Sequence, residues 1–115
     1  MVYTADSLAL ATLELSVHLT GARMKYTAIE LEIPDRLVDT LEVADLRRAW
    51  TNHPEATARV GDAWARSGRS LALAVPSALV DARSDERNVL LDPQHPEMDA
   101  VVEVQRFDVT LDERL

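Results

Sequence analysis

An uninterrupted apolar run, SLALAV at residues 70–75, constrains the fold of this 115-residue chain most, because it lies between two chain-breaking residues, Gly68 and Pro76. A short apolar run with such flanks is typical of a strand buried in the middle of a sheet. Residues 26–33 (YTAIELEI) instead set threonine, isoleucine and leucine side chains against two glutamates, and Pro34 ends the segment. This period of two predicts a half-buried strand.

A first helix is predicted before these strands, from about Ser7 to Thr20. Thr4 or Asp6 can act as its N-cap, and Gly21 can end it, since glycine adopts the conformation that terminates helices. Residues 35–50 show no clear periodicity and stay unassigned.

A second helix is predicted in the segment NHPEATARVGDAWARSG, which ends at Gly68. Thr51 or Asn52 can cap its N-terminus, and Pro54 suits its first turn, where the missing N–H costs nothing. Its apolar face is predicted from the helical spacing of four residues: Ala56, Val60, Ala63 and Trp64.

Two more strands are predicted near residues 89–91 and 101–107, after a polar excursion and on either side of a DPQHP turn. The order helix, strand, helix, strand, loop, strand favours an α+β class over a regular βαβ array, because the connections vary in length. A chain of this length is expected to form one core. We therefore predict a single compact domain over residues 1–115, with a mixed sheet and flanking helices.

The composition excludes several classes of protein. The sequence has no cysteine, which excludes disulfides, thiolate zinc sites, iron–sulfur clusters and cysteine nucleophiles. The net charge is -8, and residues 81–115 hold ten acids against four bases, so we expect no direct binding to nucleic acid. No apolar run reaches the roughly 18 residues that span a bilayer, so we expect no membrane segment and a cytoplasmic protein.

Common metal and nucleotide motifs are also absent from the sequence. His18, His53 and His95 lie far apart without the spacing of metal ligands, so no metal site is predicted. The three glycines of the chain, at positions 21, 61 and 68, form neither a dinucleotide fingerprint nor a P-loop.

The first predicted helix holds the most informative polar residues. Between Ser7 and Ala22 the only ionisable side chains are Glu14 and His18. Glu14 lies roughly 40° around the helix from Leu10, on the apolar side. A carboxylate there is expected in a cleft or an active site, because buried acids cluster at functional sites. The structural alternative is a pair of Glu14 with His18 or with an arginine.

Two further residues are candidates for ligand contacts. Ser77 follows Pro76 at the end of the apolar run, and we expect its hydroxyl at the rim of a loop, where ligands often bind but turn serines are also common. No Gly-x-Ser-x-Gly elbow surrounds it, so no serine nucleophile is predicted. Asn88, in DERNVLLDP, can bind a ligand or satisfy its own turn.

Taken together, four blocks of the sequence resemble one family. VYTADSLALATLEL with His18 just after it, then YTAIELEIPD, GDAWARSGRSLALAVPSALV and ERNVLLDPQHPEM, are similar to the RES-domain proteins, the toxin half of bacterial RES-Xre toxin-antitoxin pairs. The resemblance extends from Val2 to about Phe107. Its most specific part is the succession of GDxWxxSGRS, VPS and LLxPxHP.

The resemblance implies an α+β fold related to that of the ADP-ribosyltransferases and an activity that destroys NAD+. In such toxins the bond between nicotinamide and ribose is broken, with water or phosphate as the acceptor, and some relatives ADP-ribosylate a protein. NAD+ is then a substrate, and no cofactor is expected. The implied partner is an Xre-type helix-turn-helix antitoxin, and a homodimer stays open as a second association.

The resemblance also assigns site residues. Glu14 in TLEL matches the family's glutamate, Ser77 in VPS matches its serine, and Tyr3 in VYT matches its active-site tyrosine. These three residues are expected to be catalytic. His18 and Asn88 lie in matching blocks and are expected to bind the substrate.

Family members usually have a stretch before the VYT block, with a Gly-x-Arg-Trp-Asn-like motif and arginines expected to grip the NAD pyrophosphate. In this sequence Met1 directly precedes that block, and we do not assign Arg23, Arg69 or Arg83 to the same role. We expect either a start codon assigned too late or a shortened relative. The alternative functions are a noncatalytic RES-like protein that binds an antitoxin or itself, and a protein ADP-ribosyltransferase.

Overall fold

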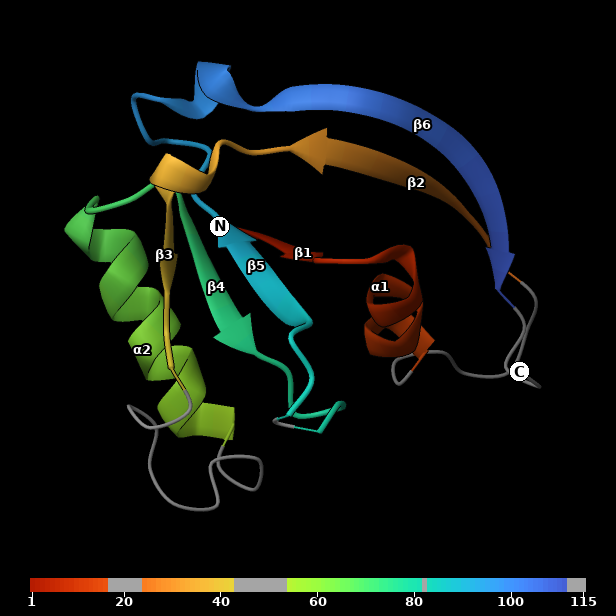
Figure 1. Ribbon diagram of the computed structural model, residues 1–115, viewed down its shortest axis with the longest axis horizontal. Helices are drawn as coiled ribbons and strands as arrows, with labels where there is room; N and C mark the ends of the chain where they lie inside the picture. The colour runs from red at the N-terminus through yellow and green to blue at the C-terminus, as the bar shows by residue number, and fades with distance from the viewer. Residues whose placement is uncertain (17–23, 43–53, 82, 112–115) are drawn as a thin grey trace.

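The computed structural model describes residues 1–16, 24–42, 54–81 and 83–111 (Figure 1). Their elements are β1 (Val2–Ala5), α1 (Leu8–Ser16), β2 (Met24–Glu32), a 3₁₀ turn (Asp35–Leu37), β3 (Val38–Thr40), α2 (Pro54–Ser67), β4 (Ala72–Pro76), β5 (Arg87–Leu91), a second 3₁₀ turn (Met98–Ala100) and β6 (Val102–Leu111). None of the helices described is long and apolar enough to cross a membrane.

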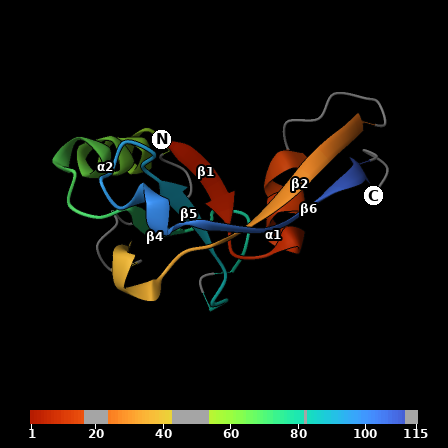
Figure 2. The same ribbon diagram turned by 90° about the horizontal axis from the view of Figure 1, so that it is seen from above.

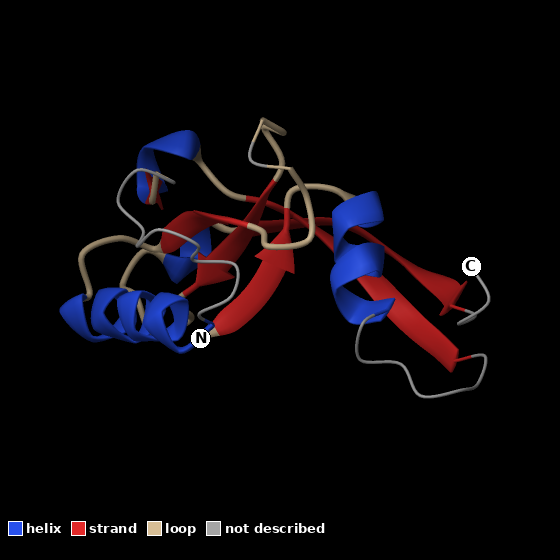
Figure 3. Ribbon diagram, turned by 90° about the horizontal axis from the view of Figure 1, so that it is seen from below, coloured by secondary structure: helices blue, strands red, loops and turns tan. Residues whose placement is uncertain are grey.

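β4 is an inner strand of a four-stranded sheet with the order β1-β5-β4-β3. β3 runs parallel to β4, whereas β5 is antiparallel to both β4 and β1, so the predicted mixed sheet is confirmed. All residues of β4 are buried, which confirms the strand predicted from SLALAV. The two helices flank this main sheet at opposite ends, as Figures 1 and 3 show, and the α+β class is confirmed.

Each face of the main sheet has its own hydrophobic cluster, because successive side chains of a strand point to opposite faces. The cluster below α2 consists of Trp64, Leu73, Val75 and Leu90. The cluster on the other face consists of Leu37, Leu71, Ala72 and Leu91.

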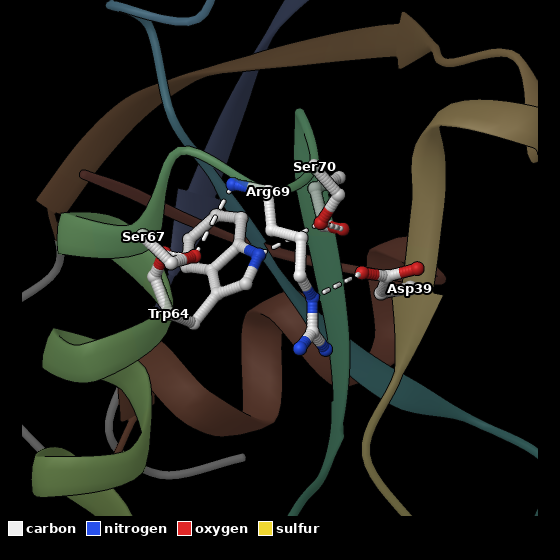
Figure 4. A network of polar contacts seen from close by, with 6 residues as sticks. Asp39, Trp64, Ser67, Arg69 and Ser70 are labelled. Atoms are coloured by element: carbon white, nitrogen blue, oxygen red, sulfur yellow. Dashed lines mark hydrogen bonds and ion pairs between the residues drawn. The ribbon is translucent and has the colours of Figure 1, made fainter.

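α2 confirms the second predicted helix and its end. Gly68 has a φ of +64°, the left-handed conformation in which glycine ends helices without a steric penalty. Trp64 is buried, and its indole Nε1 donates to the hydroxyl of Ser70 at 2.8 Å (Figure 4). One residue predicted for the apolar face is exposed, Ala63, because α2 faces the sheet through Gly61, Trp64 and Ala65.

β2 and β6 form a separate antiparallel ribbon that extends from the main sheet over α1 (Figures 1 and 2). The pairing shifts between Glu30 and Leu31, and beyond this irregularity Leu31 and Ile33 pack against the core. The strand predicted at residues 26–33 is confirmed, but its burial is only partial. Ile29 is 48% exposed, because a ribbon of two strands has no further strand to cover it.

The N-cap of α1 differs from the prediction. Ser7 caps the helix, since its Oγ accepts a hydrogen bond from the backbone N–H of Leu10 at 3.0 Å. Thr4 instead lies in β1 and donates to a backbone carbonyl of β5, and the carboxylate of Asp6 accepts the backbone N–H of Arg87. Both residues predicted as caps therefore form hydrogen bonds with β5 and do not cap the helix. The predicted stop at Gly21 and the caps Thr51 and Asn52 lie outside the described residues.

Candidate active site

The carboxylate of Glu14 is the centre of a compact polar cluster. Glu14 lies one turn after Leu10, the buried residue of α1, and its side chain is partly buried. Its Oε1 atom accepts two hydrogen bonds, from the hydroxyl of Ser77 at 2.5 Å and from the Nδ2 of Asn88 at 2.7 Å. The fold thus joins three of the five predicted site residues through one oxygen atom.

The pairing of the strands explains why these residues meet. Asn88 of β5 pairs with Val75 of β4 on one side and with Ala5 of β1 on the other. Ser77 comes two residues after Val75, so it leaves β4 on the same side as Asn88. α1 begins three residues after Ala5, which brings Glu14 to the same end of the sheet.

Ser77 is buried, with 3% of its surface exposed, so its predicted place at the rim of a loop is wrong. Its hydroxyl donates to Glu14, and its Oγ accepts the backbone N–H of Leu79 at 3.1 Å. The turn after β4 therefore folds over Ser77 instead of presenting it to solvent.

The second carboxylate oxygen of Glu14, Oε2, has no hydrogen-bond partner within the ranges that the structure describes. The pair of Glu14 with an arginine, one structural alternative, is not formed there either. His18, the other proposed partner and a predicted substrate-binding residue, lies outside the described residues. The described part of the site therefore leaves one oxygen of the acid available.

Ser7 fixes the helix that bears Glu14, a role that the sequence reasoning missed. Besides capping α1, its hydroxyl donates to the carboxylate of Glu86, which directly precedes β5. The position of Ser7 immediately before the apolar helix pattern was the available signal for a cap. Glu86, the partner of Ser7, is 79 residues away in the sequence, so no local sequence pattern indicates this hydrogen bond.

Tyr3 is the most exposed of the large apolar or aromatic side chains described, at 72%. It pairs with Leu90, which is two residues from Asn88, so the Tyr3 and Asn88 side chains lie on the same face of the sheet. The Tyr3 hydroxyl forms no hydrogen bond with any residue that the structure describes. Tyr3 thus offers a free aromatic ring on the face that carries the amide of Asn88.

A cavity of about 780 Å³ lies between the β2–β6 ribbon, β1 and α1. Tyr3 lines it, but Glu14, Ser77 and Asn88 do not. The residues of α1 that face this cavity are Leu8, Ala11, Thr12 and Leu15. Glu14 therefore projects from a different side of α1, toward the ends of β4 and β5.

An ion pair lies in the connection between Ser77 and Asn88. The guanidinium of Arg83 binds both carboxylate oxygens of Asp81, at 2.9 and 3.1 Å. This side-chain contact and the contact with the backbone N–H of Arg83 both lower the pKa of Asp81. The side-chain contact also raises the pKa of Arg83.

No group of three or more potential metal ligands occurs in the described parts of the chain.

Comparison with known proteins gives consistent matches. The RES domain family model matches residues 1–112. A protein of Sphingobium sp. (strain YBL2) named "Prs ADP-ribosylating toxin" is 38% identical over 104 residues, which cover 84% of this chain and 63% of that protein. Proteins named "Toxin Res" from Photorhabdus laumondii and Yersinia enterocolitica are 32% and 33% identical over 99% of this chain, and 74% and 76% of their own lengths are covered.

Proposed function

This chain belongs to the RES domain family, and on that premise we propose that it is the toxin of a bacterial toxin-antitoxin pair and degrades NAD+. The bond that it breaks joins nicotinamide to ribose. One observation supports this proposal more than any other: the carboxylate of Glu14 is held through Oε1 by Ser77 and Asn88, while Oε2 has no partner among the described residues. Such an acid is fixed in position and still able to act.

The proposed chemistry uses this fixed negative charge. When the bond between C1′ of the ribose and the nicotinamide nitrogen breaks, the electron pair leaves with nicotinamide, and positive charge develops on C1′ and the ring oxygen. A carboxylate stabilises this oxocarbenium-like state. Water or phosphate then bonds to C1′ through an oxygen, and when water is the acceptor it releases one proton to the solvent. Glu14 is the proposed catalytic residue.

Tyr3 is proposed to bind the nicotinamide end of NAD+. Its exposed ring lies on the same face of the sheet as Asn88, and aromatic rings stack on flat heterocycles. NAD+ is a substrate in this reaction, and no further cofactor enters it.

A second candidate function is the transfer of ADP-ribose to a protein. It is favoured by the name of the Sphingobium relative, "Prs ADP-ribosylating toxin". The same bond breaks in both reactions, but a side chain of the target protein takes the place of water or phosphate. NAD+ labelled in its adenylate half separates the two, because only protein transfer leaves the label on a polypeptide.

The test of the NAD+ proposal is the substitution Glu14→Gln. We expect the rate of nicotinamide release from NAD+ to fall by about 10²-fold or more, because the amide lacks the charge that stabilises the cationic sugar. The fold should persist, since the amide oxygen can still accept from Ser77 and Asn88. Glu32→Gln is the matched control, because Glu32 is an exposed acid of β2 and should leave the rate unchanged.

Two outcomes would contradict the NAD+ proposal. Wild-type protein could leave NAD+ intact with both water and phosphate as acceptors, or Glu14→Gln could release nicotinamide as fast as the wild type. If wild type and Glu14→Gln are also equally harmless in cells while a partner still co-purifies, the noncatalytic binding role takes its place.

The proposed partner is an Xre-type helix-turn-helix antitoxin. The acidic character of residues 81–115, with ten acids and four bases, suits a basic partner surface. Co-expression with such a protein should relieve growth arrest by the wild-type chain and should yield a complex. Size measurement of the purified chain alone checks the open possibility of a homodimer.

A further inference from the structure

We propose that Asn88 and Ser77 are positioning residues that act through Glu14, and that Oε2 of Glu14 is the oxygen that faces the ribose. This inference rests on the proposed function for its consequence in turnover. The hydrogen-bond geometry that carries it is independent of that function. Both donors bind the same atom, Oε1, although Ser77 follows β4 and Asn88 lies in β5.

The bonding capacity of Ser77 leaves little for a substrate. A hydroxyl has a single hydrogen to donate, and Ser77 gives it to Oε1 of Glu14. Its oxygen accepts the backbone N–H of Leu79, and its side chain is buried. A hydrogen bond donated by Ser77 to NAD+ would therefore require its bond to the Glu14 carboxylate to break.

The backbone of Asn88 is held from both sides. It pairs with Ala5 of β1 and with Val75 of β4, so this backbone cannot shift without disrupting two strand contacts. Its Nδ2 reaches Oε1 of Glu14 from this fixed base. A hydrogen bond from a neutral donor to a carboxylate is stronger than one between neutral groups, so the amide restrains the acid.

Together, the two hydrogen bonds restrict the rotation of the Glu14 carboxylate. A carboxylate can exchange its two oxygens by rotation about its last side-chain bond. With Ser77 and Asn88 both on Oε1, this rotation would break two bonds at once. Oε2 therefore has a fixed orientation, and its lone pairs are not used by hydrogen bonds in the described portion of the chain. Both properties suit it to stabilise the positive charge on the ribose. Reactions that depend on such alignment lose much of their rate when a group moves by about 1 Å.

The first test compares the kinetics of Asn88→Ala and Ser77→Ala with NAD+ as the substrate. We expect kcat to fall by about 10- to 100-fold in each variant while KM stays near the wild-type value, because alignment is lost and substrate contacts remain. Ser77→Thr, which keeps the hydroxyl, should recover most of the rate. Ser70→Ala is the matched control: it removes the Trp64 hydrogen bond, and should reduce stability without changing turnover per folded molecule.

A double-mutant cycle separates positioning from direct contact. In a Glu14→Ala background the added change Asn88→Ala should cost no further activity, because the residue through which it acts is gone. If the activity lost in the double variant equals the product of the losses in the two single variants, the inference is overturned, and Asn88 contacts the substrate itself. A raised KM with unchanged kcat in Asn88→Ala would overturn it as well.

The third measurement does not depend on NAD+ turnover. In ¹⁵N-edited NMR spectra of the full chain, the side-chain amide protons of Asn88 should shift strongly in Glu14→Ala and should shift little in Glu32→Ala. Unchanged Asn88 amide signals in Glu14→Ala would overturn the positioning role even if the protein consumes NAD+. If the wild type leaves NAD+ intact but these signals shift, the proposed function fails and the role of Asn88 in holding Glu14 stands.

Discussion

Among individual residues, Asp81 shows how a local contact sets the charge state of a side chain. The Arg83 guanidinium binds both of its carboxylate oxygens, and the Arg83 backbone N–H binds one of them. Both contacts favour the ionised acid and lower its pKa below the ordinary value of 3.8. The pair is exposed, so solvent screens it and its effect on overall stability is small.

We therefore expect the carboxyl carbon of Asp81 to titrate below pH 3.8 when it is followed by ¹³C NMR. Because the pKa in the folded state is lowered, the contact stabilises the turn above the ordinary pKa, and this contribution is lost as the pH falls through the lowered value. Arg83→Ala should raise the midpoint toward 3.8, because the guanidinium contact is lost while the contact with the backbone N–H stays. The same midpoint in wild type and Arg83→Ala would show that the ion pair does not persist in solution.

The sequence allowed one part of the candidate site to be predicted at this scale and left another hidden. Helical spacing placed Glu14 on the same side as Leu10, and Leu10 is indeed the buried residue of α1. The contacts of Glu14 with Ser77 and Asn88 join residues 63 and 74 positions apart. No local pattern encodes such separations, so the hydrogen bonds that hold the acid could come only from the structure. The family resemblance named these residues without giving their geometry.

At the level of single elements, α2 ends where the backbone turns left-handed at Gly68. The φ of +64° there is unfavourable for a side chain, although no atom lies within 4 Å of a Cβ placed on this residue. We expect Gly68→Ala to lower the free energy of unfolding by about 1–2 kcal/mol through backbone strain alone. Chemical denaturation measures this change.

Gly68→Asn is the comparison that isolates the cause. Asparagine tolerates the left-handed conformation better than alanine, so its loss of stability should be smaller. Equal stabilities of the wild type and Gly68→Ala, or a greater loss in Gly68→Asn, would mean that the backbone at the end of α2 relaxes away from this conformation.

Elements with strong local signals were predictable, and short elements that depend on distant partners were not. β4 has an apolar run with chain breakers at both ends, and α2 has a regular apolar spacing and a terminal glycine. β1 and β3 are four and three residues long, and each is a strand because of its neighbour in the sheet. β1 also lies where the sequence offered caps for a helix, so strand pairing took Thr4 and Asp6 from that role.

For the whole molecule, the division into a main sheet and a separate ribbon predicts unequal local stability. β4 and β5 are inner strands between buried clusters, whereas β2 and β6 have only each other as strand partners. Amide hydrogens of β2 and β6 should therefore exchange faster than those of β4 and β5, through openings that require less free energy than global unfolding.

Hydrogen exchange followed by NMR or mass spectrometry checks this expectation, and the ribbon contains its own control. Leu31 packs against the core, so the part of β2 near it should be protected better than the part near Met24, which is 47% exposed. Uniform protection across both sheets would show that the ribbon and the main sheet open as one unit.

The number of sheets could not be predicted from the order of elements. The α+β class followed from the varying lengths of the connections between the predicted helices and strands, and it is confirmed. A period of two shows that one face of a strand is more apolar, but it does not show which strand will be its neighbour. Residues 26–33 therefore predicted a half-buried strand and gave no sign of a ribbon that leaves the main sheet.

The single buried residue of α1 has a consequence for how such a protein could be tuned. Leu10 is the buried apolar residue of this helix, and hydrogen bonds of Ser7 and Glu14 hold the helix in place. Loosening α1 would therefore displace the Glu14 carboxylate before the main sheet unfolds. Substitutions along α1 can therefore change the position of Glu14 by degrees while the rest of the fold persists.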